Sequence, residues 1–535
     1  MKLPLLISVC LFSTFSYGQS KKISFKIGEE YELPRKSEDL AFFGNDKDGI
    51  INLSLKKEEI NIVRFDPLTL RKTIEKKIDL DEATRNFNSE RIVTMDNNYF
   101  WMHSDWDKST ETEMLFYDKI DVASGKLTEK NHKLFETRKL AGSATNAGRL
   151  YSFKLINKYK FKYDVEKKKL LVVYRFHPLE RNDKLNYDKI GLQVFDKQMN
   201  KLWSNEYTMP YTEAMMDNSD FSVDSKGNAY LLTKVYDGNT RNEKDKITGK
   251  PGYHFEVFKF TGTSKNFTRT SINVDDYYVD EPNIIENSQH DMIIAGSYSK
   301  KAKVTSTDGI FLATLDQDGK LTKYKNGYYE FPLAEMEKFE SARTKRKMEK
   351  KEDYENPVLI IRDVVVSADG SVFVACEESF SITNTYWTSN GGSTTRVTFY
   401  AEDIIAAKIN PSGQFAWVRK VPKRQKSYSL SDGMGFKLIN DTAGYYFMFL
   451  DNKKNMELAE NEVPKYHING KGGQVVVVML DNNGNMKKEL LFDTREEDVA
   501  IDPRDFTQFN SNQFIGRVTL KRNVFQPLLI TVNQH

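Results

Sequence analysis

The stretch "VVVVMLDNNGNMKKELLF", residues 475–492, decides the fold, because it joins an apolar run, a short polar turn and a second strand. Its Asp481, Asn483 and Asn485 place side-chain oxygens at alternate positions, as a calcium-binding loop does. An EF-hand loop starting at Asp481 needs Gly at its sixth position, which is Met486 here. A tight turn that starts at an Asp, with Gly taking the positive φ angle, explains these residues without a metal. The sequence therefore predicts a β-hairpin here and no metal site.

The same phrase recurs along the chain, for example as "IFLATLDQDGKLTKYK" and "IIAAKINPSGQFAWVRKV". Successive turn starts are separated by 55, 75, 65, 55, 94 and 71 residues, enough in each case for four short strands and their loops. The turns start at Asp66, Asp121, Asp196, Thr261, Asp316, Asn410 and Asp481.

A second phrase, again a turn followed by an apolar strand, precedes each of these hairpins. Examples are "NDKDGIINLSL", "VDSKGNAYLLTKV" and "VSADGSVFVACEE". One unit is therefore strand, turn, strand, loop, strand, turn, strand, which is the four-stranded antiparallel meander of a propeller blade. A single meander cannot bury both of its faces, so the units must stack on one another. The expected fold class is all-β, as one large β-propeller.

Seven such units are visible, and strand-like segments lie outside them at both ends of the chain. Residues 504–535 contain three more, "RDFTQFNSN", "QFIGRVTLKRN" and "QPLLITVNQH", and the N-terminal segment "KISFKIGEEYELP" (22–34) supplies another. We expect eight blades, with the N-terminal strand closing the last blade, because closure removes open sheet edges. Seven blades is the alternative. Two tandem smaller domains are disfavoured, because no Pro/Gly/Ser-rich linker divides the chain.

Two insertions account for the long 94-residue spacing. Residues 333–353 are rich in strong helix formers and predict a helix. Residues 381–404, "SITNTYWTSNGGSTTRVTFYAEDI", predict a β-rich extension between the second and third strands of the sixth unit.

The chain begins with Lys2, an apolar core and the small residue Gly18, which is the pattern of a secretory signal peptide over residues 1–18. We expect cleavage near Gly18/Gln19, leaving the propeller domain at 19–535 in the periplasm or outside the cell. No later stretch is apolar enough for a transmembrane segment. Cys376 is the single cysteine left after cleavage, and it is expected to face a sheet interior rather than to act as a nucleophile.

Charge and motifs exclude several function classes. The chain has 79 Lys and Arg against 76 Asp and Glu, so removing Lys2 leaves 78 against 76, or +2, and no global field for nucleic acid. No histidines stand at i and i+4, and no Gly-x-Ser-x-Gly elbow or phosphate-binding glycine loop occurs. The sequence therefore predicts no cofactor, and a monomer.

The phrase "VDSKGNAYLLTKV" (223–235) resembles the D-x-x-G-N-x-Y blade phrase of several bacterial propeller families. The stretch "EDIIAAKINPSGQFAWVRKVPKRQ" is similar to uncharacterised exported propeller-like proteins of Bacteroidota, in layout over most of the chain and specifically around residues 381–450. That group implies an exported propeller and no catalytic residue. The WD dipeptides of WD40 repeats and the paired glycines of kelch repeats are absent. In "SVDSKGNAY" one residue too many separates Asp224 from Gly227 for the Asp-box of sialidases.

The best candidate surface in the sequence is the sixth-unit extension, where aromatic side chains stand among Thr, Ser, Asn and Gly. Aromatic residues in a polar insertion stack on sugars or anchor a protein partner. The alternative is that they only cap their own hairpin by cross-strand pairing. The candidate binding residues are Tyr386, Trp387, Arg396, Phe399 and Tyr400.

These observations favour a non-enzymatic binding or scaffold module for a protein, peptide or glycan in the cell envelope. The alternative is a hydrolase or lyase that acts on polysaccharide or peptide at the central funnel, since propellers carry both kinds of function. Carboxylates, His or Arg converging on the axis would favour the enzyme. An apolar or aromatic patch on one rim would favour the binding module.

Overall fold

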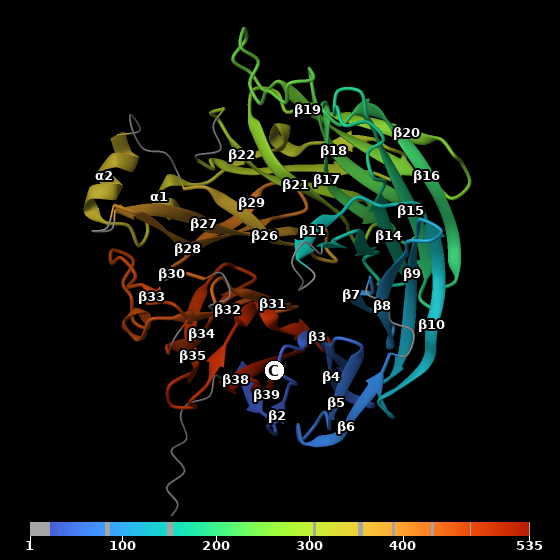
Figure 1. The fold of residues 1–535 in the computed structure, drawn as a ribbon. Coiled ribbons are helices and arrows are strands. Elements are labelled where there is room, and N and C mark those ends of the chain that lie inside the picture. The colour runs from blue at the N-terminus through green and yellow to red at the C-terminus, as the bar shows by residue number, and fades with distance from the viewer. Residues whose placement is uncertain are drawn as a thin grey trace, which may run out of the picture.

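The computed structural model describes residues 22–80, 86–146, 153–302, 306–350, 357–387, 391–429, 433–470 and 472–533. The chain is all-β, and its sheets surround a central space, with the first strand of several sheets toward the centre (Figure 1). The expected signal peptide, 1–18, lies outside the described residues. No helix in the described ranges is long and apolar enough to cross a membrane.

Each of the first five large sheets is built from consecutive strands. The first sheet holds β3 (Glu38–Asn45), β4 (Gly49–Lys56), β5 (Glu59–Phe65) and β6 (Lys72–Asp79). The second holds β7 (Asn88–Met95), β8 (Asn98–Asp107), β9 (Thr112–Asp121) and β10 (Lys126–Thr137). The third holds β13 (Tyr159–Tyr163), β14 (Lys169–Arg175), β15 (Tyr187–Asp196) and β16 (Lys201–Thr212). The fourth holds β17 (Met216–Val223), β18 (Ala229–Tyr236), β19 (Tyr253–Phe260) and β20 (Phe267–Ile272). The fifth holds β21 (Tyr278–Glu286), β22 (Met292–Ser299), β23 (Gly309–Leu315), β24 (Leu321–Thr322) and β25 (Tyr328–Glu330).

The last three sheets draw on more distant segments. The sixth holds β26 (Leu359–Val366), β27 (Val372–Trp387), β28 (Ser393–Ile409), β29 (Phe415–Val421), β30 (Gln425–Ser427) and β33 (His467–Ile468). The seventh holds β31 (Lys437–Asp441), β32 (Gly444–Asp451), β34 (Gln474–Asp481) and β35 (Met486–Asp493). The eighth holds β36 (Ala500–Ile501), β37 (Thr507–Gln508), β38 (Gln513–Lys521) and β39 (Val524–Val532), together with β1 (Ile23–Ile27) and β2 (Tyr31–Glu32).

The N-terminal strand pairs with a strand of the C-terminal sheet. β1 pairs antiparallel with β39, in a register that places Ile23 opposite Val532 and Ile27 opposite Leu528. The two ends of the described chain are therefore held in one sheet by backbone hydrogen bonds.

Apolar clusters fill the spaces between neighbouring sheets, because each meander is buried on both faces. One cluster joins the sixth and seventh sheets through Phe373, Trp417 and Phe447. Another joins the eighth sheet to the first, with Ile515 packed among residues such as Phe65. Cys376 belongs to the cluster between the fifth and sixth sheets and is fully buried, which confirms its predicted place in a sheet interior.

The Asp side chains that start the turns bind backbone, which confirms the predicted hairpin at residues 475–492. Asp481 Oδ1 accepts hydrogen bonds from the backbone N–H of Asn483 and of Asn485, both at 2.8 Å. In the propeller-like phrase of the fourth sheet, Asp224 is buried and accepts bonds from the Asn228 N–H (2.7 Å) and the Tyr230 hydroxyl (2.9 Å). In both phrases the carboxylate satisfies a turn.

The helical insertion is divided into two short helices, α1 (Leu333–Met336) and α2 (Ala342–Lys350), where the sequence predicts one helix over 333–353. The reason lies at Phe339, which has a positive φ of 61° and donates its backbone N–H to the Glu460 carbonyl instead of to a helical partner. Residues 351–353 lie outside the described ranges.

A few small elements complete the described chain. The short hairpin β11 (Ser143–Asn146) and β12 (Phe153–Ile156), which the sequence analysis does not predict, lies near the central space (Figure 1). Three 3-10 turns are present, η1 (Tyr324–Gly327), η2 (Lys453–Asn455) and η3 (Pro503–Asp505).

Candidate functional site

Strands β27 and β28 run far beyond the rest of the sixth sheet. They contain 16 and 17 residues, against 8 in β26 and 7 in β29. On one edge, β26 pairs with β27 only up to Glu378. On the other edge, β30 pairs with β28 only at Phe399, Tyr400 and Ala401. We call residues 379–387 and 393–401 the arm. It is about 30 Å long at 3.3 Å per residue.

The register of the arm separates the five predicted residues into two groups. Phe380 pairs with Tyr400, Tyr386 with Thr394 and Trp387 with Ser393. Because side chains alternate between the faces of a strand pair, Tyr386, Arg396 and Tyr400 share one face, while Trp387 and Phe399 lie on the other. The structure therefore brings three of the predicted residues to one side.

Cross-strand packing holds the root of that face. The rings of Phe380 and Tyr400 stack with centroids 4.7 Å apart and an interplanar angle of 8°. The Arg396 guanidinium lies 3.3 Å from the centroid of the Tyr428 ring, next to β30. The Phe380–Tyr400 stack is a cross-strand contact within the hairpin itself, whereas Arg396 packs on Tyr428 outside it. Among the described residues, Tyr386 and Trp387 stack on no other ring, and they are 52% and 80% exposed.

The same face continues beyond the arm onto β30 and β33. Tyr466 lies edge-on to Tyr400 at 6.1 Å, and its ring is 4.5 Å from the Arg424 guanidinium and 4.9 Å from the Lys426 ammonium. We call this surface the aromatic–cationic face. The sequence analysis misses Tyr428 and Tyr466, because strands as short as β30 and β33 leave no periodicity to detect. The face comprises Phe380, Ile382, Tyr386, Arg396, Tyr400, Arg424, Lys426, Tyr428, Tyr466 and Ile468.

Exposed apolar side chains gather on the arm and its surroundings. Within the described ranges, six of the sixteen large hydrophobic residues that are well exposed lie here, although the arm holds only a small part of the chain. A concentration of exposed apolar side chains is typical of an interaction surface. The six are Phe380, Ile382, Tyr386, Trp387, Tyr428 and Ile468.

A buried ion-pair network anchors the arm at its root. Glu377 is almost fully buried and is bound by Arg362 at 2.8 Å and by the Lys423 ammonium at 2.9 Å. Burial raises the pKa of Glu377, but the charges of Lys423 and Arg362 outweigh it and hold that pKa below its usual range. Lys423 also donates to the Ala401 carbonyl at 2.9 Å, which ties the network to β28. A cavity of about 430 Å³ lies beside it, lined in part by Phe380 and Tyr400.

A second group of carboxylates lies where the arm meets the helical insertion. Glu378, Glu402 and Asp403 line a cavity of about 290 Å³ together with Glu340 from the insertion. Burial, followed by repulsion from Asp403 and Glu402, raises the pKa of Glu378 to about 8. The Glu378 carboxyl is therefore largely protonated near neutral pH.

Carboxylates on the first strands of two sheets are paired with cations of a neighbouring sheet. Asp39 on β3 is bound by Arg517 of the eighth sheet, and Asp220 on β17 is bound by Lys162 of the third sheet at 2.6 Å. These pairs join one sheet to the next, which is a structural role. A cavity of about 560 Å³ lies at the first strands of the fourth to sixth sheets and contains Asp217, Glu243, Asp280, Glu281 and Lys234. The carboxylates of this cavity are the candidates for the acid and the base that the alternative function, a hydrolase or lyase, would need.

Comparison with known proteins assigns no family. No family model matches the chain, and no curated protein matches it. Among solved structures, prolyl oligopeptidase B from Galerina marginata matches with a TM-score of 0.39 and 8% identity over 93% of this chain and 55% of its own. The β-propeller domain of the Trilobed protease from Pyrococcus furiosus matches with a TM-score of 0.33 and 8% identity over 86% of this chain and 97% of its own. A protein of unknown function from Dyadobacter fermentans matches with a TM-score of 0.30 and 10% identity over 70% of this chain and 96% of its own. Likenesses at this level assign no activity to the chain.

Proposed function

We propose that this chain is an exported eight-bladed β-propeller that acts as a binding module, and that the arm captures an extended, acidic polypeptide segment. In this proposal each large sheet is one blade, and β1 closes the last blade. The pairing of β1 with β39 and the apolar cluster between the eighth and first sheets support that arrangement. Export rests on the signal-like N-terminus.

The observation that carries the proposal is the exposure of the arm. A two-stranded hairpin alone is marginally stable in water, and the distal part of the arm has no other strand beside it in the described structure. Its outer residues on β27, from Phe380 to Trp387, are all exposed. An exposed strand edge next to apolar side chains is the surface on which an extended peptide adds as a further strand.

At the root of the arm, a polypeptide fits this surface better than a glycan. Sugar recognition needs the open face of an aromatic ring. Near the root, the Phe380 and Tyr400 rings face each other, and cations cover the rings of Tyr428 and Tyr466. Hydrogen bonds along a free strand edge remain, and these recognise a peptide backbone.

The charge of the face favours an acidic segment. Arg396 and Lys426 lie on it, and neither forms an ion pair within the described part of the chain, whereas Arg424 is paired with Glu402 at 3.4 Å. Two unpaired cations beside apolar side chains complement a strand that alternates acidic and apolar residues.

The test uses fluorescence anisotropy with two labelled ten-residue peptides, one alternating Glu with Val and the other alternating Lys with Val. We expect the acidic peptide to bind the full chain and the basic peptide not to bind. The double variant Arg396→Glu/Lys426→Glu should weaken binding of the acidic peptide at least tenfold. Ile382→Asp should weaken it by a similar factor through the lost apolar contact.

The matched control is Ile247→Asp, which places the same charge at a 95% exposed position in the loop between β18 and β19, outside the arm. That variant should bind as the parent chain does. Equal binding of both peptides, or an affinity unchanged by the double variant, would contradict the proposal. If the chain dimerises with increasing concentration and the double variant abolishes the dimer, the partner of the arm is a second copy of the chain and not an acidic peptide.

A further inference from the structure

The arm has a second face, opposite the aromatic–cationic face, and the proposed function makes no use of it. Side chains alternate between the two faces along β27 and β28, so the register of the arm assigns three directly opposed pairs to this side. We call it the hydroxyl face; its pairs are Thr383 with Val397, Thr385 with Thr395, and Trp387 with Ser393. Five of these side chains are exposed, and Val397 is partly buried.

No charged residue belongs to the outer part of the arm. Residues 379–395 contain no Asp, Glu, Lys, Arg or His, although Asp, Glu, Lys and Arg make up 29% of the chain. The next residue, Arg396, belongs to the opposite face, where its guanidinium lies on the Tyr428 ring. The six side chains of the hydroxyl face therefore offer no counter-charge to an acidic or a basic ligand, and they favour a neutral one.

The hydroxyl groups of this face are not used by the fold. In the described part of the chain, the side chains of Thr383, Thr385, Ser393 and Thr395 make no hydrogen bond. Each hydroxyl both donates and accepts, as the hydroxyl groups of a sugar do. Side chains on one face of a strand recur about every 6.6 Å, and opposed ones lie about 5 Å apart. This regular array matches a partner that itself repeats its hydroxyl groups.

Trp387 adds an open aromatic ring at the outer end of the array. It is 80% exposed, and among the described residues it stacks on no other ring. The axial C–H groups of a sugar form an apolar patch that packs on the negative face of an indole ring. Rings at the root of the arm lack this freedom, because Phe380 and Tyr400 stack on each other. The hydroxyl face therefore has the open ring that sugar recognition needs.

A lipid surface fits the hydroxyl face less well. Trp side chains favour the membrane–water interface. However, the threonine and serine hydroxyls would lose water there without gaining partners. The same holds for the backbone groups at the outer edges of the arm, since β26 and β30 pair with it only near its root. A polysaccharide instead replaces that water with its own hydroxyl groups.

We propose that the hydroxyl face binds a neutral polysaccharide chain. One sugar ring stacks on Trp387, and the neighbouring sugars exchange hydrogen bonds with the hydroxyl groups of Thr383, Thr385 and Thr395. This site does not depend on the proposed function, because the acidic peptide uses the strand edge and the opposite face. Both sites can be occupied at once.

Biolayer interferometry with the full chain tests this proposal. The probes are biotinylated hydroxyethyl cellulose, laminarin, galactomannan and dextran, which are all neutral. We expect at least one of them to bind the chain. Its affinity should not change between about 50 mM and about 500 mM NaCl, because no charge takes part.

Variants of exposed residues assign the binding to one face. Trp387→Ala should weaken it at least about tenfold. Thr383→Val/Thr385→Val keeps the side-chain shape and the strand preference but removes two hydroxyl groups, and it should weaken binding at least about fivefold. Tyr386→Ala removes the neighbouring ring on the opposite face and should have no effect on the glycan. The matched control outside the arm is Tyr187→Ala, which is also 52% exposed and should bind as the parent does.

Three results would overturn the proposal: no binding to any of the four polymers, equal losses from Trp387→Ala and Tyr386→Ala, or an affinity unchanged by the double threonine variant. Binding to phosphatidylcholine vesicles that Trp387→Ala abolishes would assign the face to lipid instead. A dimer that this variant abolishes would assign it to a second copy of the chain. Trp387→Ala should leave binding of the acidic peptide unchanged, so this proposal and the proposed function fail separately.

Discussion

The seventh sheet and the arm use the same strand geometry in opposite environments. Every residue of β32, from Gly444 to Asp451, is buried, because this strand lies inside a sheet with another sheet packed on each face. On the arm, every residue of β27 from Phe380 to Trp387 is exposed. Apolar residues in β32 are needed for folding. Those at the tip of the arm contribute no packing to the core.

That difference separates folding from function in this chain. A buried aromatic ring in a sheet needs no explanation beyond its packing. An exposed one such as Trp387, on a hairpin that leaves its sheet, is not explained by folding. The comparison therefore predicts that variants in the two regions affect different measurements, stability in the seventh sheet and binding in the arm.

The largest expected effect is on stability, from Phe447→Ala in β32. Phe447 is fully buried between the sixth and seventh sheets. Removing its ring should lower the free energy of unfolding by about 3 to 5 kcal/mol. Trp387→Ala, the matched change on the arm, should shift it by less than about 0.5 kcal/mol. Urea unfolding followed by fluorescence measures both, and comparable losses would show that the arm belongs to the core.

A somewhat smaller loss is expected at the junction of the two regions, from Lys423→Met. This substitution removes one of the two cations that form ion pairs with the buried Glu377 in the described structure, and it should cost about 3 kcal/mol of unfolding free energy. The double variant Lys423→Met/Glu377→Gln should recover part of that loss, because the buried charge is removed as well. Purely additive losses in this double-mutant cycle would show that the pair does not couple the arm to its sheet.

The smallest effect is a pH dependence at the base of the arm. The pKa of Glu378 is raised to about 8 in the folded chain, so the folded state keeps this proton while the unfolded state loses it. The stability contributed by the protonated carboxyl is present at low pH and is lost as the pH rises through about 8. Glu378→Gln should remove this part of the pH dependence. The difference in Tm between variant and parent should then grow by roughly 1 to 2 °C from pH 5 to pH 9.

Scanning calorimetry at pH 5, 7 and 9 measures this change. Glu457→Gln, at an exposed carboxylate in the loop after β32, serves as the control and should leave the pH dependence of the parent unchanged. A Tm difference that stays constant across this range in Glu378→Gln would contradict the raised pKa.

Most of the fold follows from local patterns. The recurring turn predicts the hairpin from Gln474 to Asp493, because an Asp that binds the turn backbone needs no distant partner. The extension at 381–404 is also visible locally, since a β-rich insertion interrupts a regular spacing. The division of the helical insertion cannot be predicted from the sequence. It depends on the Phe339 N–H, which donates to the carbonyl of Glu460, more than a hundred residues away in the chain.

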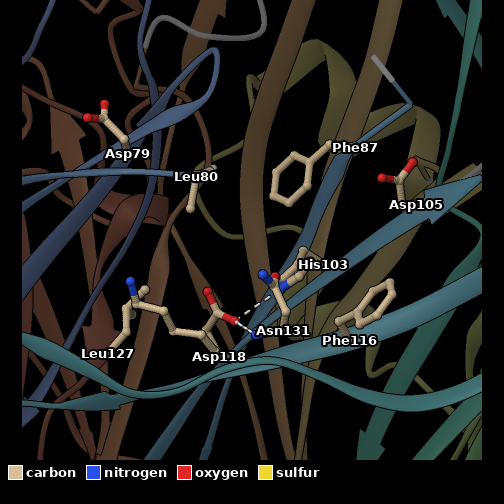
Figure 2. A pocket seen from close by; sticks show the side chains of 10 residues that line it. Asp79, Leu80, Phe87, His103, Asp105, Phe116, Asp118, Leu127 and Asn131 are labelled. Carbon is tan, nitrogen blue, oxygen red and sulfur yellow. Dashed lines mark hydrogen bonds and ion pairs between the residues drawn. The ribbon is translucent and has the colours of Figure 1, made fainter. Parts of the chain in front are cut away.

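The candidate sites depend more on distant residues. The strand pattern identifies Tyr386 and Arg396, and only the register shows that they share a face. His103 and Asp118 lie on adjacent strands of one hairpin, so a search for polar residues on a common face of neighbouring strands would have paired them. Both residues line a cavity of about 410 Å³ between the first and second sheets (Figure 2). Its opposite wall, Asp79 and Leu80, comes from the end of the preceding sheet, and no local pattern predicts how the two sheets pack.

The sequence by itself determined the repeating strand, the all-β class and the position of the arm, because alternation and turn chemistry act over a few residues. Only the tertiary structure decided which side chains stay exposed on the arm and which line the cavity beside His103. Burial and charge at those places depend on how one sheet packs against the next, and that packing joins residues far apart in the chain.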